Sequence, residues 1–212
     1  MKPEKTIRKP NQARSIETKG KIISAANELF AELGYYKTTT KLIAKRAGVP
    51  VGSVYAYFTD KKGVLLESIR IGHEKIKENM TNVETEERFT DSTKVDIKEF
   101  IRSIIESNIE VHRLLPVFHR DMKSLKQTEP DIRKQLEESE KKSYEQTKSI
   151  LKAKSDIIST EDIEAASIIV HRIIEDLTHF LTYEDTEIEK ERIIDEAVIM
   201  LSSYLNSEAK HF

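Results

Sequence analysis

Residues 38–62 read TTTKLIAKRAGVPVGSVYAYFTDKK, and this stretch decides the fold. It predicts two short helices joined by a tight turn. Thr39 or Thr40 can cap the first helix, because a threonine hydroxyl accepts a hydrogen bond from a free N-terminal amide. Gly48 ends that helix, since glycine adopts the left-handed C-terminal conformation without steric cost. A proline then starts the second helix, expected over residues 51–58. Together these elements form the helix-turn-helix signature.

The second helix has two different sides when its residues are placed at about 100° each. Val54 and Phe58 fall on one side and are expected to pack inward. The opposite side carries only small residues and is flanked by Tyr55 and Tyr57. A side without bulk can approach base edges in a major groove, and each phenol can reach a phosphate on one wall. The small outward residues are Gly52, Ser53 and Ala56. A purely packing role for the tyrosines leaves these small residues unexplained.

The charge is distributed unevenly along the chain. The 212 residues carry a formal net charge of −2. Residues 1–62 alone contain 13 Lys or Arg and 5 Asp or Glu, so the remainder is strongly acidic. The basic part is also the part that holds the predicted helix-turn-helix. This asymmetry indicates a polyanionic partner for the N-terminal end, rather than a chance distribution of solvated charge.

The composition excludes several classes of protein. Hydrophobic residues make up 38% of the chain and charged residues 34%, which fits a soluble protein with a core. The chain has no cysteine, which excludes a disulfide framework, a thiolate metal site and a cysteine nucleophile. No apolar run reaches the ~18 residues of a membrane span, and no apolar signal segment opens the chain. We therefore expect an all-helical, cytoplasmic protein without a membrane partner.

The N-terminal sequence resembles the DNA-binding domain of the tetracycline-repressor (TetR) family. The resemblance covers AANELFAELGYYKTTTKLIAKRAGV, GSVYAYF and the segment around Lys61, within residues 19–66. Two departures are Pro50, where a serine cap is common, and Lys62, where a glutamate is common. The resemblance implies an all-helical fold, with a three-helix DNA-binding domain and a larger helical domain for ligand binding and dimerisation. The DNA contacts that it implies are Thr39, Thr40, Lys41, Val51, Gly52, Ser53, Tyr55, Tyr57 and Lys61.

The chain is expected to divide into three parts. Residues 1–17 are polar and basic and predict a flexible arm. Residues 18–66 form the DNA-binding domain, and residues 67–212 form the regulatory and dimerisation domain. Every periodic segment after residue 93 is helical, with an interruption at Pro116.

The last two predicted helices, over residues 160–181 and 187–205, are apolar around most of their girth. Such helices need neighbours on more than one side. A four-helix bundle with a second copy of the chain supplies them, and so does a hairpin buried in a monomer. The TetR resemblance favours the dimer. The predicted interface residues are Ile169, Ile173, Leu177, Phe180, Ile194, Val198, Leu201 and Leu205.

Polar residues at intervals within apolar helix faces predict a pocket for a small, mostly apolar effector. They are Asn108, His112, His119, His171, Glu175 and His179. The spacing of the last three suits a metal ion, but such residues more often line a pocket edge or a polar seam, so no metal is predicted. A filled core with locally satisfied polar groups is the plainer alternative.

No nucleophile elbow and no glycine-rich phosphate loop is visible, so neither an enzyme nor a cofactor is predicted. The leading interpretation is a homodimeric repressor that leaves a palindromic, double-stranded operator when it binds a small effector. A non-inducible architectural DNA-binding dimer is the second interpretation. A helical enzyme with an accessory DNA-binding end is the third.

Overall fold

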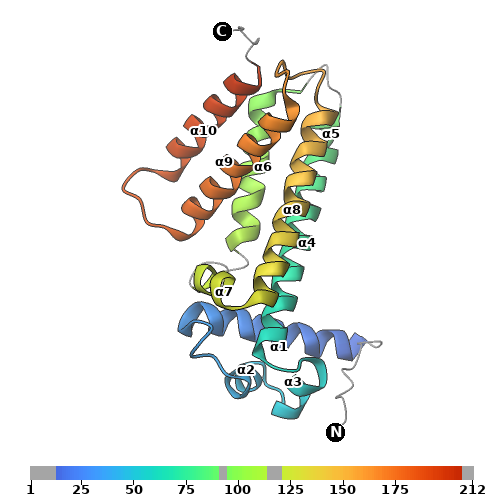
Figure 1. The fold of residues 1–212 in the computed structure, drawn as a ribbon, viewed down its shortest axis with the longest axis vertical. Helices are drawn as coiled ribbons and strands as arrows, with labels where there is room; N and C mark the ends of the chain where they lie inside the picture. The colour runs from blue at the N-terminus through green and yellow to red at the C-terminus, as the bar shows by residue number, and fades with distance from the viewer. Residues whose placement is uncertain (1–12, 91–94, 114–120, 207–212) are drawn as a thin grey trace. The chain divides into compact units, whose positions relative to one another are not determined.

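The computed structural model describes residues 13–90, 95–113 and 121–206, which form helices and no strand (Figure 1). This confirms the all-helical class. The helices are α1 (Ala13–Leu33), α2 (Thr40–Arg46), α3 (Val51–Tyr57), α4 (Lys61–Thr85), α5 (Glu87–Thr90), α6 (Ile97–Arg113), α7 (Met122–Thr128), α8 (Pro130–Ala153), α9 (Ile163–Tyr183) and α10 (Lys190–Leu205). None of these helices is both long enough and apolar enough to cross a membrane.

The chain folds into two compact units. The first contains α1 to α3, α4 as far as Gly72, α7, and α8 as far as Leu136. The second contains the rest of α4, α5, α6, the rest of α8, α9 and α10. The chain therefore returns to the N-terminal unit after α6, which chain order alone does not suggest. The three-part division expected from the sequence stays a prediction.

Several helix ends differ from the sequence expectations. α1 begins at Ala13, so residues 13–17, expected in the arm, are helical. α9 begins at Ile163 rather than at residue 160, and the Asp162 carboxylate caps it by accepting a hydrogen bond from the Ala165 amide. Pro116 lies outside the described residues.

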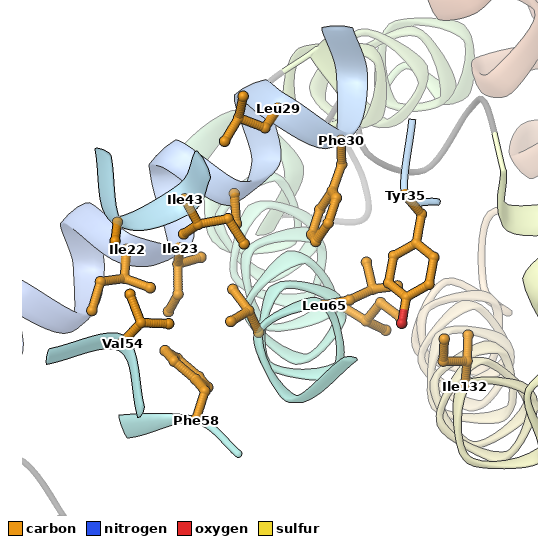
Figure 2. Packing of buried hydrophobic residues seen from close by; sticks show 14 of the residues in the cluster. Ile22, Ile23, Leu29, Phe30, Tyr35, Ile43, Val54, Phe58, Leu65 and Ile132 are labelled. Atoms are coloured by element: carbon orange, nitrogen blue, oxygen red, sulfur yellow. The ribbon is translucent and has the colours of Figure 1, made fainter. Parts of the chain in front are cut away.

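The core of the first unit is one cluster of buried apolar side chains (Figure 2). α1 contributes Ile22 and Phe30, and the second helix of the helix-turn-helix contributes Val54. α4 contributes Leu65, while Ile132 comes from the start of α8. All five are almost fully excluded from solvent. The helix-turn-helix is therefore held by a core that also includes the first turn of α8.

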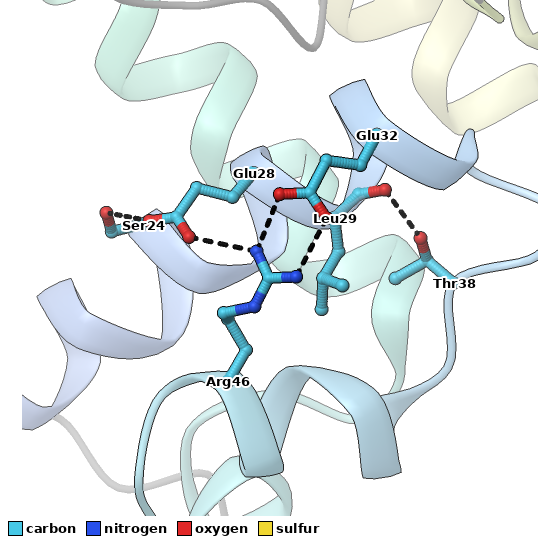
Figure 3. A network of polar contacts seen from close by, with 6 residues as sticks. All are labelled: Ser24, Glu28, Leu29, Glu32, Thr38 and Arg46. Atoms are coloured by element: carbon cyan, nitrogen blue, oxygen red, sulfur yellow. Dashed lines mark hydrogen bonds and ion pairs between the residues drawn. The ribbon is translucent and has the colours of Figure 1, made fainter.

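A polar network fixes α2 against α1 (Figure 3). The Arg46 guanidinium makes two parallel hydrogen bonds to Glu32, at 2.9 and 2.7 Å, and a third to Glu28 at 3.1 Å. Such bidentate pairs constrain geometry as well as charge. The hydroxyl of Thr38 donates toward the carbonyls of Leu29 and Gly34, at 3.2 and 2.8 Å. These contacts set the position of the segment that enters α2.

In the second unit, α6 contacts both α9 and α10 (Figure 1). The α10 residues expected at a dimer interface are directed into this unit's own core: Ile194, Val198, Leu201 and Leu205 are all buried within one chain. Leu201 is only 1% exposed. The sequence expectation for these four residues is corrected, because burial within one chain leaves them no surface to offer a partner.

Candidate functional site

The start of α2 and the turn after it have the capping and turn residues that the sequence predicts. The Thr39 hydroxyl accepts a hydrogen bond from the Leu42 amide at 3.2 Å, so Thr39 is the cap. Gly48 has a φ of 66°, which is the left-handed conformation expected at a helix end. α3 then begins after Pro50 without a side-chain cap, as the missing hydroxyl predicts.

α3 presents the two sides expected of it. Val54 and Phe58 are buried in the core of the first unit. Tyr55 is 39% exposed, and Val51 is exposed to a similar degree. A Cβ atom added to Gly52 meets no heavy atom of the protein within 4 Å, so the surface there is open. The outward side of α3 is accessible and low in bulk, which a close approach to a DNA groove requires.

Both tyrosine hydroxyls of α3 reach a neighbouring helix. The Tyr55 hydroxyl lies 2.9 Å from the Thr40 hydroxyl of α2, and the Tyr57 hydroxyl lies 2.8 Å from the Ser15 hydroxyl of α1. The two phenols are thereby held on either side of the small residues of α3. Three of the predicted DNA-contact residues, Thr40, Gly52 and Tyr55, thus lie together on the exposed side of these two helices. Lys41 and Ser53 belong to the same two helices.

Lys61 has a structural role that the sequence did not reveal. Its ammonium donates to three backbone carbonyls, those of Tyr35, Tyr36 and Thr38, at 2.7, 3.2 and 3.0 Å. It also lies 4.3 Å from the centre of the Tyr35 ring. Burial lowers the pKa of Lys61. Its three N–H donors are thus all directed at the loop before α2, so a DNA phosphate would have to replace one of these acceptors.

Further contacts attach α7 and α8 to the same loop and to α4. The Tyr35 amide donates to the Asp121 carboxylate at 2.5 Å, just before α7. Lys62, which departs from the family pattern, pairs with Asp131 at 3.0 Å and Glu129 at 3.4 Å. Lys62 is therefore engaged in ion pairs at the start of α8. These pairings join residues far apart in sequence, and no local pattern announces them.

An ion-pair cluster joins α1 to α4. The Glu67 carboxylate pairs with Lys19 at 2.6 Å and with Arg70 at 2.9 Å. Hydrogen bonds from Arg70 lower the pKa of Glu67 to about 2, assisted by Lys19 and opposed by partial burial. Because the Lys19–Glu67 pair is largely shielded from solvent, it ties α1 to α4 more firmly than a fully exposed pair would.

A narrow, mostly apolar cavity lies in the second unit. The space inside it, counted together with the part that is open to solvent, is about 600 Å³. Residues from α4, α6, α8, α9 and α10 line it. The polar lining residues are Asn108, Ser143, Thr147, Lys154, His171 and Glu175, and the apolar ones include Phe100, Ile101, Ile104, Ile150, Leu151 and Val170.

His171 has a buried ring nitrogen that no group in the described part of the chain hydrogen-bonds. Its Nδ1 lies 3.4 Å from the Thr147 hydroxyl, which also lies 3.2 Å from the Ser143 carbonyl. Its Nε2 is the buried nitrogen without a hydrogen-bond partner there. Burial also lowers the pKa of His171, which favours the neutral ring.

The cavity collects three of the six predicted pocket residues: Asn108, His171 and Glu175. Glu175 is one helical turn from His171, and burial raises the pKa of its carboxyl. His112 and His179 lie outside the cavity lining, and each imidazole ring lies near the ring of Tyr183. His119 falls outside the described residues. In the part of the chain that the structure describes, no three His, Asp or Glu side chains gather closely enough to hold a metal ion.

A different set of apolar residues faces outward from the last two helices. On α9, Ile168 and Ile169 are exposed, and Ile173, Leu177 and Phe180 are partly so. On α10, Ile199 is 49% exposed and Met200 is 50% exposed. The α9 half of the predicted interface is thus available to a partner, while α10 presents two residues that were not predicted. Ile199 and Met200 were not predicted because they stand between two other apolar residues, Val198 and Leu201. A run of apolar residues does not show which of its side chains face inward.

Fold and site together define a class: a helix-turn-helix protein whose second, helical unit encloses a cavity. Comparison with known families agrees. Residues 22–68 match the family model described as "Bacterial regulatory proteins, tetR family", and residues 96–205 match the model described as "Tetracyclin repressor-like, C-terminal domain". The second match alone covers more than half of the chain. The chain belongs to the TetR family of transcriptional regulators.

Individual relatives match shorter stretches. The chain is 46% identical over 54 residues to the HTH-type transcriptional regulator HbdR of Aromatoleum sp. (strain CIB), covering 26% of this chain and 24% of that protein. It is 31% identical over 108 residues to the regulator AcrR of Shigella flexneri, covering 49% of each. The chain thus spans half or less of the length of these curated relatives. The solved structure of the fatty acid degradation regulator FadR from Bacillus halodurans has a TM-score of 0.66 at 19% identity, covering 96% of this chain and 100% of that one. At 19% identity, this similarity supports the fold and no statement about function.

Proposed function

We propose that this protein is a homodimeric repressor that binds a palindromic operator through α2 and α3. The observation that carries the proposal is the outward side of α3, where Gly52 leaves open space and Tyr55 is half-exposed. Hydroxyl groups positioned beside a low-bulk helix suit phosphates beside base edges. The proposed contacts are Thr39, Thr40, Lys41, Val51, Gly52, Ser53, Tyr55, Tyr57 and Lys61.

The proposed dimer uses the exposed apolar residues of α9 and α10. Side chains such as Ile169 and Met200 remain half in water in a single chain. Clustered apolar surface of this kind is a common mark of a protein interface. A two-fold dimer would present two α3 helices to two half-sites, separated by about one turn of DNA or a multiple of it.

The proposed effector occupies the cavity of the second unit. The narrow apolar walls and the buried Nε2 of His171, which has no partner among the described residues, suit a small, mostly apolar molecule. Such a molecule releases DNA only if it binds more tightly to a conformation that does not fit the operator. Linkage then requires the operator to weaken effector binding by the same factor, typically about 5- to 150-fold.

Selection of duplexes from a random-sequence DNA pool tests the DNA-binding part of this proposal. The full-length protein should enrich a two-fold symmetric site, and light scattering should give the mass of two chains. A protein without Tyr55 and Tyr57 hydroxyls is the matched control and should enrich the site more weakly. Failure to enrich any sequence, at low salt as well as at physiological salt, would contradict the proposal.

A further inference from the structure

A buried ammonium group lines the cavity, and it forms no ion pair with the residues that the structure describes. Lys154 follows the last turn of α8 and is only 6% exposed. Its Nζ donates to the Phe89 carbonyl and lies 5.5 Å from the centre of the Phe100 ring. Among the residues that the structure describes, no carboxylate pairs with Lys154. A buried charge without an opposite charge is unfavourable, so this position is suited to a ligand that brings a negative group.

The Lys154 ammonium has capacity for such a group. It carries three N–H donors, and the Phe89 carbonyl takes one of them. The Phe100 ring offsets part of the cost of burial through its electron-rich face. A carboxylate oxygen would accept a remaining N–H in a charge-assisted hydrogen bond, which is about twice as strong as a neutral one.

The cavity walls next to Lys154 are apolar. Ile150 and Leu151 line the cavity from the same helix, and Ile101 and Ile104 line it from α6. Thr147, which contacts His171, is separated from Lys154 by about 10 Å at the rise of an α-helix. A ligand that begins at Lys154 and runs along α8 toward Thr147 therefore passes the side chains of Ile150 and Leu151.

The cavity disfavours a second carboxylate. Among its described lining residues, Lys154 is the one Lys or Arg side chain. A second carboxylate would therefore be buried without a cation, which is unfavourable. A ligand with one negative end and an apolar far end suits this arrangement, and a dicarboxylate does not.

We infer that the cavity binds a monocarboxylic acid with an unbranched apolar chain about as long as that of octanoate. Its carboxylate lies on Lys154, and its chain runs between α6 and α8 toward His171. Only the consequence for DNA rests on the proposed function, since the binding itself requires the second unit alone.

Calorimetry on the full-length protein, without DNA, tests this inference with octanoate, 1-octanol and octanedioate. Octanoate should bind about 10- to 100-fold more tightly than 1-octanol, because only octanoate makes a hydrogen bond to a charged group. Octanedioate should bind no more tightly than 1-octanol, because its second carboxylate finds no second Lys or Arg in the described lining. Equal affinities for octanoate and 1-octanol, or no binding of either, would overturn the inference without use of any variant.

Lys154→Met provides a second measurement. It should lower octanoate affinity to that of 1-octanol and leave 1-octanol affinity unchanged. Its unfolding temperature without ligand should equal or exceed that of the wild type, because an unpaired buried charge is removed. Lys152→Met is the matched control, since Lys152 is an exposed lysine of the same helix paired with Glu164. A Lys154→Met protein that binds octanoate like the wild type would contradict the inference.

The two proposals can fail separately. If octanoate binds as expected but leaves operator affinity unchanged, the inferred site stands and its role as an effector site in repression fails. If the protein binds operator DNA but does not bind octanoate, the inference fails and DNA binding by α2 and α3 stands.

Discussion

The hydroxyl groups of Thr40 and Tyr55 lie 2.9 Å apart and join the two helices of the helix-turn-helix at their exposed side. This hydrogen bond needs only one of the two hydroxyl protons. The pair therefore holds α2 and α3 together on the side that we propose for DNA binding. We expect the same two hydroxyl groups to contribute to DNA affinity.

Removing one hydroxyl of this pair should affect DNA more than folding. Tyr55→Phe is expected to weaken operator binding by about 3- to 10-fold, as the loss of one hydrogen bond predicts, and to change the free energy of unfolding by less than about 1 kcal/mol. Fluorescence anisotropy and chemical denaturation measure the two quantities. A cycle with Thr40→Val should be non-additive, because both variants break the same contact. Additive effects on operator affinity would argue against a shared role.

Lys61 is expected to stabilise the loop before α2. Lys61→Met leaves the carbonyls of Tyr35, Tyr36 and Thr38 without their donor, so the free energy of unfolding should fall by about 1–3 kcal/mol. Urea denaturation measures this loss. Lys41→Met is a suitable comparison, since Lys41 has an exposed position on α2.

The same Lys61 variant tests the phosphate contact that the family resemblance implies. One lost phosphate contact should flatten the dependence of log affinity on log salt concentration by about one unit. An unchanged slope, together with a lower stability, would assign Lys61 to the loop alone.

The dimer proposal predicts different outcomes for exposed and buried apolar residues. Met200→Glu and Ile169→Glu should convert a dimer to a monomer without unfolding it, because both side chains are about half-exposed in one chain. Ile16→Glu is the control, since Ile16 is equally accessible but belongs to α1. Leu201→Glu should unfold the chain instead, as it places a charge in the core. Light scattering and circular dichroism distinguish these outcomes, and a wild-type monomer at micromolar concentration would eliminate the dimer.

Acid should destabilise the second unit at mildly low pH. Burial lowers the pKa of His73 and of His112 to about 4, from an ordinary value near 6.5, with smaller contributions from Lys142 to the first and from His179 to the second. As the pH falls from about 6.5 to about 4, the unfolded chain binds protons that the folded chain does not. The free energy of unfolding should therefore fall over this range, by on the order of 2 kcal/mol for each histidine.

His112→Phe checks this expectation, because it removes one titrating group and keeps an aromatic ring. Denaturant unfolding at a series of pH values should show a shallower loss of stability for the variant than for the wild type. Parallel pH profiles for the two proteins would show that the His112 ring is not responsible.

The local features of the helix-turn-helix could be predicted from the sequence because short-range rules govern them. The Thr39 cap, the left-handed Gly48 and the inward Val54 each depend on neighbours within a few residues. The family resemblance then allowed the all-helical fold class to be predicted as well. These predictions needed no knowledge of how distant segments meet.

The remaining features depend on tertiary contacts. Lys61 reads as a surface lysine until the loop carbonyls surround it, and the Asp121 contact with Tyr35 joins residues far apart in the chain. α10 is apolar on so many sides that its sequence does not reveal that Leu201 faces inward and Met200 outward. Lys154, among many lysines near α8, carries no local sign of burial. The cavity therefore emerged only from the structure.

The central claim, that the outward side of α3 contacts DNA, is tested most directly by Gly52→Ala. The added methyl group meets no protein atom within 4 Å, and alanine is favoured over glycine in a helix by roughly 0.5–1 kcal/mol. Gly20→Ala in α1 is the matched control, since a Cβ there also meets nothing. Anisotropy with the selected duplex and thermal unfolding should show a Gly52→Ala protein that is more stable yet binds DNA more weakly, and a Gly20→Ala protein that is more stable with unchanged DNA affinity. Equal DNA affinity for the wild type and Gly52→Ala, across several salt concentrations, would contradict the account.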